Sequence, residues 1–170
     1  MKKLSIIIIL ISALCSCCKR AYCPAFPAEL NYFPYSKGQE IFFYNSQDTL
    51  TFVITRQGNS EASDFGYNSH YHCEIGSTVQ MDGIYGVINF IGGETVSKID
   101  VEFYLSNGEV LGKTLYEGNS IPYAEVGKYF NDTISIEKEN NKTINKIIIV
   151  KNKGLVSYAT ADGEEWKLVE

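Results

Sequence analysis

The stretch Lys98-Ile99-Asp100-Val101-Glu102-Phe103-Tyr104-Leu105 decides the fold class, because its apolar residues recur at every second position. A period of two is that of a β-strand, in which successive side chains point to opposite faces of the sheet. Ile99 and its apolar partners therefore share one face, and Lys98 and its polar partners share the other. We expect the first face to be buried.

The pair Asn107-Gly108 follows this stretch and is typical of a two-residue hairpin turn. With such a turn Ser106 faces Glu109, Leu105 lies opposite Val110, and Glu102 lies opposite Lys113. The sequence therefore predicts a hairpin whose register can be tested.

Further β-rich runs lie on both sides of this hairpin, separated by turn-forming residues. They cover residues 40–44, 50–55, 71–81, 84–91, 133–137, 147–150, 155–160 and 165–168. Asp82-Gly83 predicts a two-residue turn, and Asp162-Gly163 predicts a turn that places Trp166 opposite Ala159. Residues 56–68 are expected to form a polar loop. The run 147–150 is apolar on both faces, which predicts a central strand.

One short helix is expected to begin at Ser120 and to end near Tyr129. The fold class predicted from these patterns is mainly β. It is an antiparallel meander of about ten strands that forms a sandwich or small barrel, with at most one short helix.

The N-terminus has a basic start followed by an apolar run from Leu4 to Leu14, which is the length of a signal-peptide core and too short to span a bilayer. In Leu14-Cys15-Ser16-Cys17, only Cys17 has a branched apolar residue three places before it and a small residue immediately before it. This segment resembles the processing site of bacterial lipoproteins. The alternative is an ordinary cleaved signal peptide.

The lipoprotein resemblance implies cleavage before Cys17 and acylation of that residue, which anchors the protein in a membrane. The expected organisation is a signal peptide at 1–16, a lipid-anchored tether at 17–37 and a single β domain at 38–170. The residue after Cys17 is a cysteine and not the aspartate that favours inner-membrane retention, so the outer membrane is the expected location. Periplasmic and cell-surface exposure remain alternatives.

The charge of the chain excludes one class of partner. Removal of residues 1–16 takes away two of the 15 basic residues and leaves all 20 acidic ones. A nucleic-acid-binding protein needs a basic surface, so no nucleic acid is expected as a partner.

Three cysteines remain after the predicted cleavage: Cys18, Cys23 and Cys73. The compartment is oxidising and the number is odd, so one thiol must stay unpaired or pair between chains. Cys73 shares a face with Tyr71 and Ile75, which we interpret as core. We predict a disulfide between Cys23 and Cys73 that ties the tether to the sheet; the alternative is a buried free Cys73.

The only arguable metal site is on a predicted strand where His70, His72 and Glu74 share one face. The two imidazoles are close enough to bind one Zn²⁺, but Glu74 is too far from His70. A third ligand would have to come from another strand, and a solvated polar face is the favoured interpretation. No nucleophile, base and orienting group can be placed together. We therefore predict no catalytic residue, no metal ligand and no cofactor.

The closing segment, Lys153 to Tyr158 and Asp162 to Leu168, resembles the C-terminal hairpin of small lipoproteins of the Bacteroidota type. This resemblance implies a β-rich envelope protein and no particular activity. Asp48-Thr49-Leu50 and Asp132-Thr133-Ile134 are similar to the O-glycosylation sites of that group. The alternative is a turn aspartate followed by a threonine that begins a strand.

The function expected from these features is that of a membrane-anchored envelope lipoprotein acting as a non-enzymatic binding or assembly module. Its partners are the membrane, through the lipid anchor, and a protein or glycan. The alternative is an immunity or inhibitor lipoprotein that blocks a secreted toxin or hydrolase, since a small acidic domain can oppose a basic partner. A metal-dependent enzyme is the third possibility.

Overall fold

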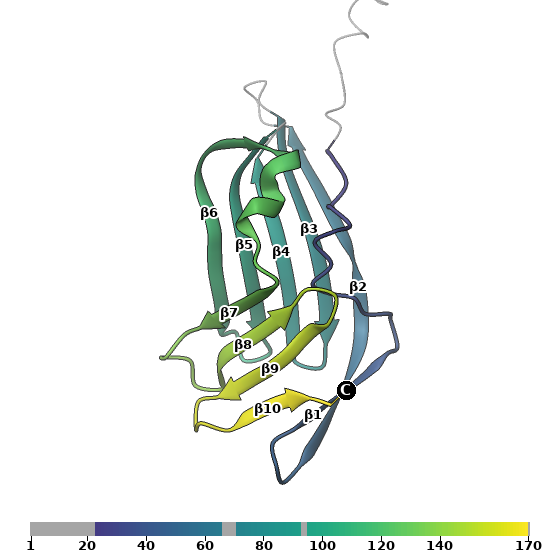
Figure 1. The fold of residues 1–170 in the computed structure, drawn as a ribbon, viewed down its shortest axis with the longest axis vertical. Helices are drawn as coiled ribbons and strands as arrows, with labels where there is room; N and C mark the ends of the chain where they lie inside the picture. Colours follow the sequence, from purple (N-terminus) through teal and green to yellow (C-terminus); the bar gives the residue numbers. More distant parts are fainter. Residues whose placement is uncertain (1–22, 66–70, 93–94, 170) are drawn as a thin grey trace, which may run out of the picture.

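The computed structural model describes residues 23–65, 71–92 and 95–169, and for 60–65 and 71–72 it describes the backbone alone. These residues form ten strands and one short 3₁₀ helix, η1 (Tyr123–Tyr129) (Figure 1). The strands are β1 (Glu40–Tyr44), β2 (Thr49–Phe65), β3 (Tyr71–Met81), β4 (Ile84–Gly92), β5 (Thr95–Leu105), β6 (Val110–Pro122), β7 (Thr133–Glu137), β8 (Ile144–Val150), β9 (Gly154–Thr160) and β10 (Glu165–Leu168).

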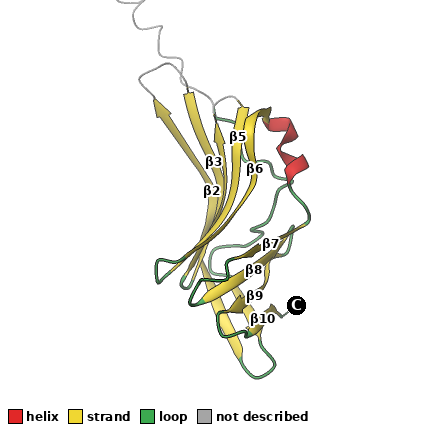
Figure 2. Cartoon of the chain, turned by 90° about the vertical axis from the view of Figure 1, so that its left-hand side faces the viewer, coloured by secondary structure: helices red, strands yellow, loops and turns green. Residues whose placement is uncertain are grey.

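The strands form a single antiparallel sheet in the order β6-β5-β4-β3-β2-β1-β10-β9-β8-β7. All neighbours are consecutive along the chain except β1 and β10, which pair through Phe43–Leu168 and Tyr44–Lys167. The long strands β2 to β6 curve strongly, and β7 to β10 cross one end of them (Figure 2). The sheet is thus a nearly closed barrel, and the prediction of a mainly β, ten-stranded antiparallel fold with one short helix is confirmed.

The two ends of the sheet, β6 and β7, are joined by side chains. The Lys113 ammonium donates to the carbonyl of Ser135 at 3.2 Å, and the Lys138 ammonium donates to the carbonyl of Val110 at 2.9 Å. Nearby, the Glu109 carboxylate accepts hydrogen bonds from the backbone N–H groups of Lys142 and Thr143 at 2.7 and 3.2 Å. These contacts hold the barrel closed on that side.

The barrel interior is filled by the chain's own N-terminal segment, residues 23–37. This segment has turns but no helix or strand, and five of its large side chains are buried: Phe26, Leu30, Tyr32, Phe33 and Tyr35. The Phe26 ring stacks on Phe90 with centroids 4.9 Å apart. The Phe33 ring meets Phe103 edge-on at 6.1 Å. The segment therefore completes the core.

The expectation that residues 17–37 form a tether outside the domain is therefore wrong for residues 23–37. Proline prevents regular strand pairing, but it does not prevent burial of neighbouring apolar side chains. Residues 17–22 lie outside the described part of the chain.

The inward face predicted for the 98–105 stretch is correct, since Ile99, Val101, Phe103 and Leu105 are all buried. The predicted register is wrong by one residue: Tyr104 lies opposite Val110, and Glu102 lies opposite Gly112. The loop has three residues and is closed by the N–H of Leu105 donating to the carbonyl of Glu109 at 2.8 Å.

This loop differs from the expected turn for a local reason. The side-chain oxygen of Asn107 accepts from the N–H of Glu109 at 3.0 Å, and the left-handed conformation falls on Gly108, with φ of +84°. A three-residue loop needs one such residue at its third position, whereas a type I′ turn needs two.

The same correction applies at Asp162-Gly163. The N–H of Thr160 donates to the carbonyl of Glu164 at 2.9 Å, so that Trp166 lies opposite Tyr158 instead of Ala159. The Trp166 and Tyr158 rings stack with centroids 6.0 Å apart. At Asp82-Gly83 the predicted two-residue turn is correct, because Met81 pairs with Ile84.

Three further expectations are corrected. Residues 56–65 continue β2 instead of forming a loop, because they pair with β3. The helix begins at Tyr123, and Ser120 belongs to β6. Strand β8 lies beside the edge strand β7 and not at the centre, with Ile147 and Ile149 buried and Ile148 half-buried.

Candidate functional site: a notch opposite the disulfide

The structure joins Cys23 to Cys73 by a disulfide, with the sulfurs 2.06 Å and the Cα atoms 5.8 Å apart. This is the pair predicted from the sequence. Cys73 lies opposite Ser63 of β2 and Gly92 of β4, near the end of the sheet where β2 and β4 finish and β3 begins. We call this end of the barrel the disulfide end.

Of the other candidate residues predicted from the sequence, only some lie within the described part of the chain. Cys17 and His70 lie outside the described residues. The backbone of His72 pairs with that of Asp64, and Glu74 is exposed. Among the described residues, no group of three His, Cys, Asp or Glu side chains is arranged to hold a metal ion. No helix within those residues is long and apolar enough to cross a membrane.

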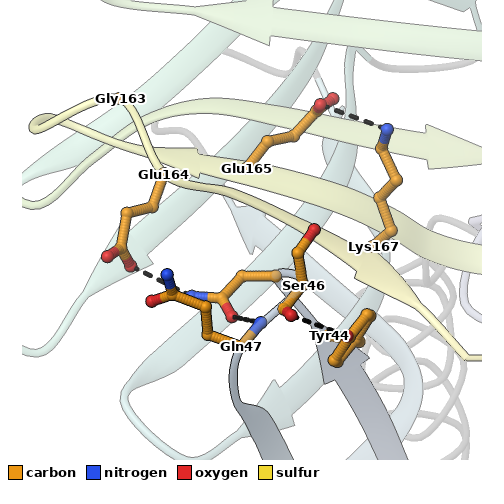
Figure 3. Close-up of a pocket in the computed structure, with 8 residues that line it drawn as sticks. Tyr44, Ser46, Gln47, Gly163, Glu164, Glu165 and Lys167 are labelled. Atoms are coloured by element: carbon orange, nitrogen blue, oxygen red, sulfur yellow. Dashed lines mark hydrogen bonds and ion pairs between the residues drawn. The ribbon is translucent and has the colours of Figure 1, made fainter.

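A notch lies at the opposite end of the barrel. It is formed by the β1–β2 turn on one side and by the β9–β10 loop with β10 on the other (Figure 3). Its volume is about 420 Å³, and it is lined by Tyr44, Asn45, Ser46, Gln47, Gly163, Glu164, Glu165 and Lys167. Because β10 pairs with β1, residues more than one hundred positions apart in the sequence share its walls.

The notch and the disulfide are separated by most of the length of β2. Thr49 pairs with Tyr44 beside the notch, and Ser63 pairs with Cys73. The strand between them spans about 45 Å at roughly 3.3 Å per residue. Figure 1 shows the same separation: residues 23–37 start at the upper end of the barrel, whereas β1 and β10 lie at the lower end.

The β1–β2 turn is held in a defined conformation by its own side chains. The Asn45 side-chain oxygen accepts from the N–H groups of Gln47 and Asp48 at 3.0 and 2.8 Å. The Tyr44 hydroxyl donates to the carbonyl of Ser46 at 2.7 Å. Ser46 has φ of +81°, a left-handed conformation that glycine adopts more easily. These contacts therefore hold the turn in one conformation.

The two walls of the notch are joined by the pairing of β1 with β10, and their loops are joined by a weak hydrogen bond from the Asn45 amide to the Glu164 carboxylate at 3.4 Å. The Lys167 ammonium forms an ion pair with the Glu165 carboxylate at 3.2 Å, and both side chains are more than half exposed. The notch thus contains two carboxylates, one ammonium and two amides.

Exposed aromatic surface borders the notch. Tyr44 is 46% exposed, and Phe42, on the same outer face of β1, is also exposed. Lys167 also lines a second hollow, of about 410 Å³, formed by residues of β8 to β10 and of the turn between β8 and β9: Val150, Lys153, Val156, Ser157 and Leu168. Polar and apolar surface therefore meet at Lys167.

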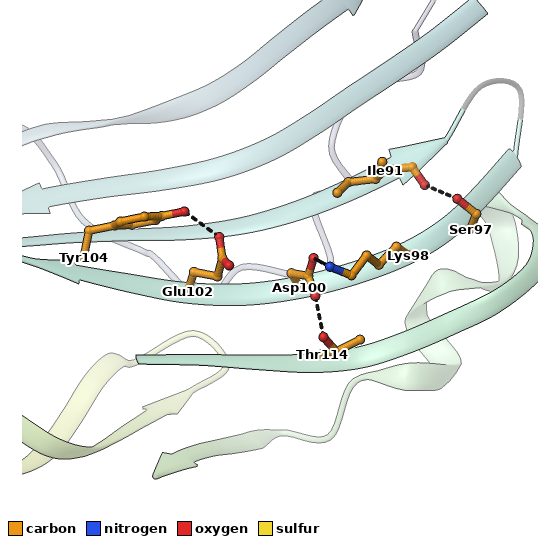
Figure 4. A network of polar contacts seen from close by, with 7 residues as sticks. All are labelled: Ile91, Ser97, Lys98, Asp100, Glu102, Tyr104 and Thr114. Carbon is orange, nitrogen blue, oxygen red and sulfur yellow. Dashed lines mark hydrogen bonds and ion pairs between the residues drawn. The ribbon is translucent and has the colours of Figure 1, made fainter. Parts of the chain in front are cut away.

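A second polar cluster on β5 and β6 is structural (Figure 4). The buried Asp100 carboxylate accepts from the Thr114 hydroxyl at 2.7 Å and pairs with the Lys98 ammonium at 2.7 Å. The hydrogen bond and charge of Asp100 raise the pKa of Lys98. A buried carboxylate with these two partners is satisfied within the protein, so we interpret the cluster as structural.

Thr49 and Thr133 are both exposed and begin β2 and β7. An exposed threonine that begins a strand is compatible with an O-glycosylation site and with a turn aspartate followed by a strand. Glycosylation of Thr49 and Thr133 therefore stays a prediction.

The notch was not predicted from the sequence. Asn45-Ser46-Gln47-Asp48 indicated a hairpin turn, and nothing local indicates that the loop at 163–165 lies against it. Comparison with protein-family models, curated proteins and solved structures found no match to the chain.

Proposed function

We propose that this protein is a lipid-anchored, non-enzymatic binding module of the outer membrane, which presents the notch end of its barrel to a partner. The observation that carries the proposal is the separation of the two ends. Cys23, the first described residue, is bonded into one end of the barrel, and the notch lies about 45 Å along β2 from it.

The burial of residues 23–37 shortens the connection to the anchor. From Cys17 to Cys23 the chain reaches at most about 20 Å, whereas a tether from Cys17 to residue 38 would reach about 70 Å. The disulfide end is therefore held near the bilayer, and the notch is directed away from it. An acylated Cys17 with two or three chains provides stable attachment.

The anchor is tested by metabolic labelling of the full-length protein with an alkyne fatty acid. We expect labelling in the wild type and in Cys15→Ala, because Cys15 leaves with the signal peptide. We expect none in Cys17→Ala. Labelling that persists in Cys17→Ala contradicts the assignment of the anchor.

The presentation of the notch is tested by photo-crosslinking in living cells. A diazirine amino acid replaces Gln47 in the notch or Asn119 on β6, which is exposed and lies near the disulfide end, where Val96 pairs with Ile121. We expect adducts from position 47 and few from position 119. Equal adducts, or adducts only from position 119, contradict the proposal.

A further inference from the structure

We infer that the notch binds a neutral saccharide, such as one or two sugar rings of a longer glycan. This inference rests on the proposed binding function and names the class of ligand. Four features of the notch carry it: its size, its fixed aromatic ring, its hydrogen-bonding groups and its charge.

The size of the notch suits a small ligand. Its volume of about 420 Å³ lies within the roughly 300–1,000 Å³ typical of small-molecule sites. A stable protein–protein interface covers about 800 Å² on each partner, which is far more surface than the walls of this notch offer. A few sugar rings are therefore a better match than a folded protein.

The aromatic ring in the notch is held in place. The Tyr44 hydroxyl donates to the carbonyl of Ser46 (Figure 3). Tyr44 is nevertheless 46% exposed. An exposed ring face is a flat apolar platform with a negative quadrupole, which attracts the C–H face of a pyranose. Because the ring is already fixed, stacking would cost little side-chain entropy.

The hydrogen-bonding groups match sugar hydroxyls. A hydroxyl both donates and accepts, and the notch supplies both partners: the Asn45 amide nitrogen donates, the Gln47 amide donates and accepts, and the carboxylates of Glu164 and Glu165 accept. The Asn45–Glu164 hydrogen bond is long at 3.4 Å, so a ligand hydroxyl can replace it at small cost.

The charge of the notch disfavours acidic sugars. The Lys167 ammonium is paired with the Glu165 carboxylate, which leaves Glu164 as an additional negative charge in the notch. A uronic acid would therefore meet a like charge, within a chain of net charge −5. Neutral sugars do not incur this repulsion.

The inference is tested with purified full-length protein in detergent. The probes are four neutral hexasaccharides, built from glucose in α- or β-linkage, from mannose or from N-acetylglucosamine, and an acidic one, hexagalacturonate. Binding is measured by isothermal titration calorimetry. We expect at least one neutral probe to bind, and hexagalacturonate to bind at least tenfold more weakly.

Matched tyrosine variants locate the site. Tyr44→Ala removes the platform and should weaken binding at least tenfold. Tyr104→Ala is the control, because Tyr104 is 41% exposed on β5 and its hydroxyl donates to Glu102 instead of lining the notch. That variant should bind as the wild type does. Near-ultraviolet circular dichroism checks that both variants stay folded.

The inference is overturned if no neutral probe binds at millimolar concentration, if hexagalacturonate binds as tightly as the best neutral probe, or if Tyr44→Ala leaves binding intact. An equal loss in Tyr104→Ala also overturns it. Fatty-acid labelling and crosslinking from position 47 need no added saccharide. Their results therefore show separately whether the proposed function stands.

Discussion

The ring of Tyr35 packs directly against Gly154, so closely that a β-carbon at position 154 would lie 2.0 Å from the tyrosine hydroxyl oxygen. The same hydroxyl accepts a hydrogen bond from the N–H of Leu155. Burial raises the pKa of Tyr35 to about 12, so the phenol stays protonated at physiological pH. The N-terminal segment, residues 23–37, thus packs against the start of β9 and forms a hydrogen bond with it.

Gly154→Ala should destabilise the protein by about 3 kcal/mol or more, because the methyl group meets Tyr35 and because φ at this position is +87°. Gly163→Ala is the matched control. Its φ is +91°, but nothing lies within 4 Å of the added carbon, so we expect a cost of only about 1–2 kcal/mol. Urea denaturation measures both; equal costs would contradict the close contact.

Phe33→Ala should cost about 3–5 kcal/mol, as expected for a buried phenylalanine in a closely packed core. Phe33 is 1% exposed and lies edge-on to Phe103. If residues 23–37 were a solvated tether, the same change would be nearly neutral. The free energies of unfolding of the wild type and of Phe33→Ala, measured by urea denaturation, distinguish these outcomes.

The Glu109 carboxylate should make stability depend on acidic pH. Its hydrogen bond from Asn107, followed by those from Lys142 and Thr143, lowers its pKa from 4.5 to about 2. A lowered pKa in the folded state means that this contribution is complete above about pH 4.5 and is lost as the pH falls towards 2. In Glu109→Gln, denaturation midpoints should fall less steeply over that range. An unchanged slope would exclude Glu109 as its source.

The Cys23–Cys73 bond encloses a loop with a sequence separation of 50 residues. In the chain-entropy model it stabilises the fold by roughly 4 kcal/mol, so Cys23→Ser with Cys73→Ser should lose about that amount. Peptide mapping without reduction should recover the linked pair. Alkylatable thiols at both positions after non-reducing denaturation would refute the bond, and Cys18→Ser is the neutral control.

The register of the β5–β6 hairpin can be tested with two charge pairs. Glu137 lies opposite Lys146, and their charged atoms are 2.6 Å apart, so a double-mutant cycle should find a salt-sensitive coupling. Glu102 lies opposite Gly112, and the Lys113 ammonium donates to the carbonyl of Ser135. A double-mutant cycle on Glu102 and Lys113 should therefore find no coupling. A coupling in the second cycle would support the two-residue turn instead.

Local patterns in the sequence predicted most of the strands and the buried face of the 98–105 stretch, but not the continuation of β2 over residues 56–65. The alternation from Ile99 to Leu105 is a property of neighbouring residues, and it predicts an inward face wherever the sheet lies. The pair Asn107-Gly108 likewise predicts a turn. It does not specify the length of the loop, because that depends on whether one or two residues take positive φ.

Only the tertiary structure decided how distant segments pack. Phe33 and Tyr35 lie in a proline-containing stretch without periodicity, and they are buried because the curved sheet leaves an interior that they fill. The notch exists because β1 pairs with β10, which brings the turn at Asn45 against the loop at Glu164. Such long-range pairing depends on the energy of the whole barrel, and no single stretch of sequence contains that information.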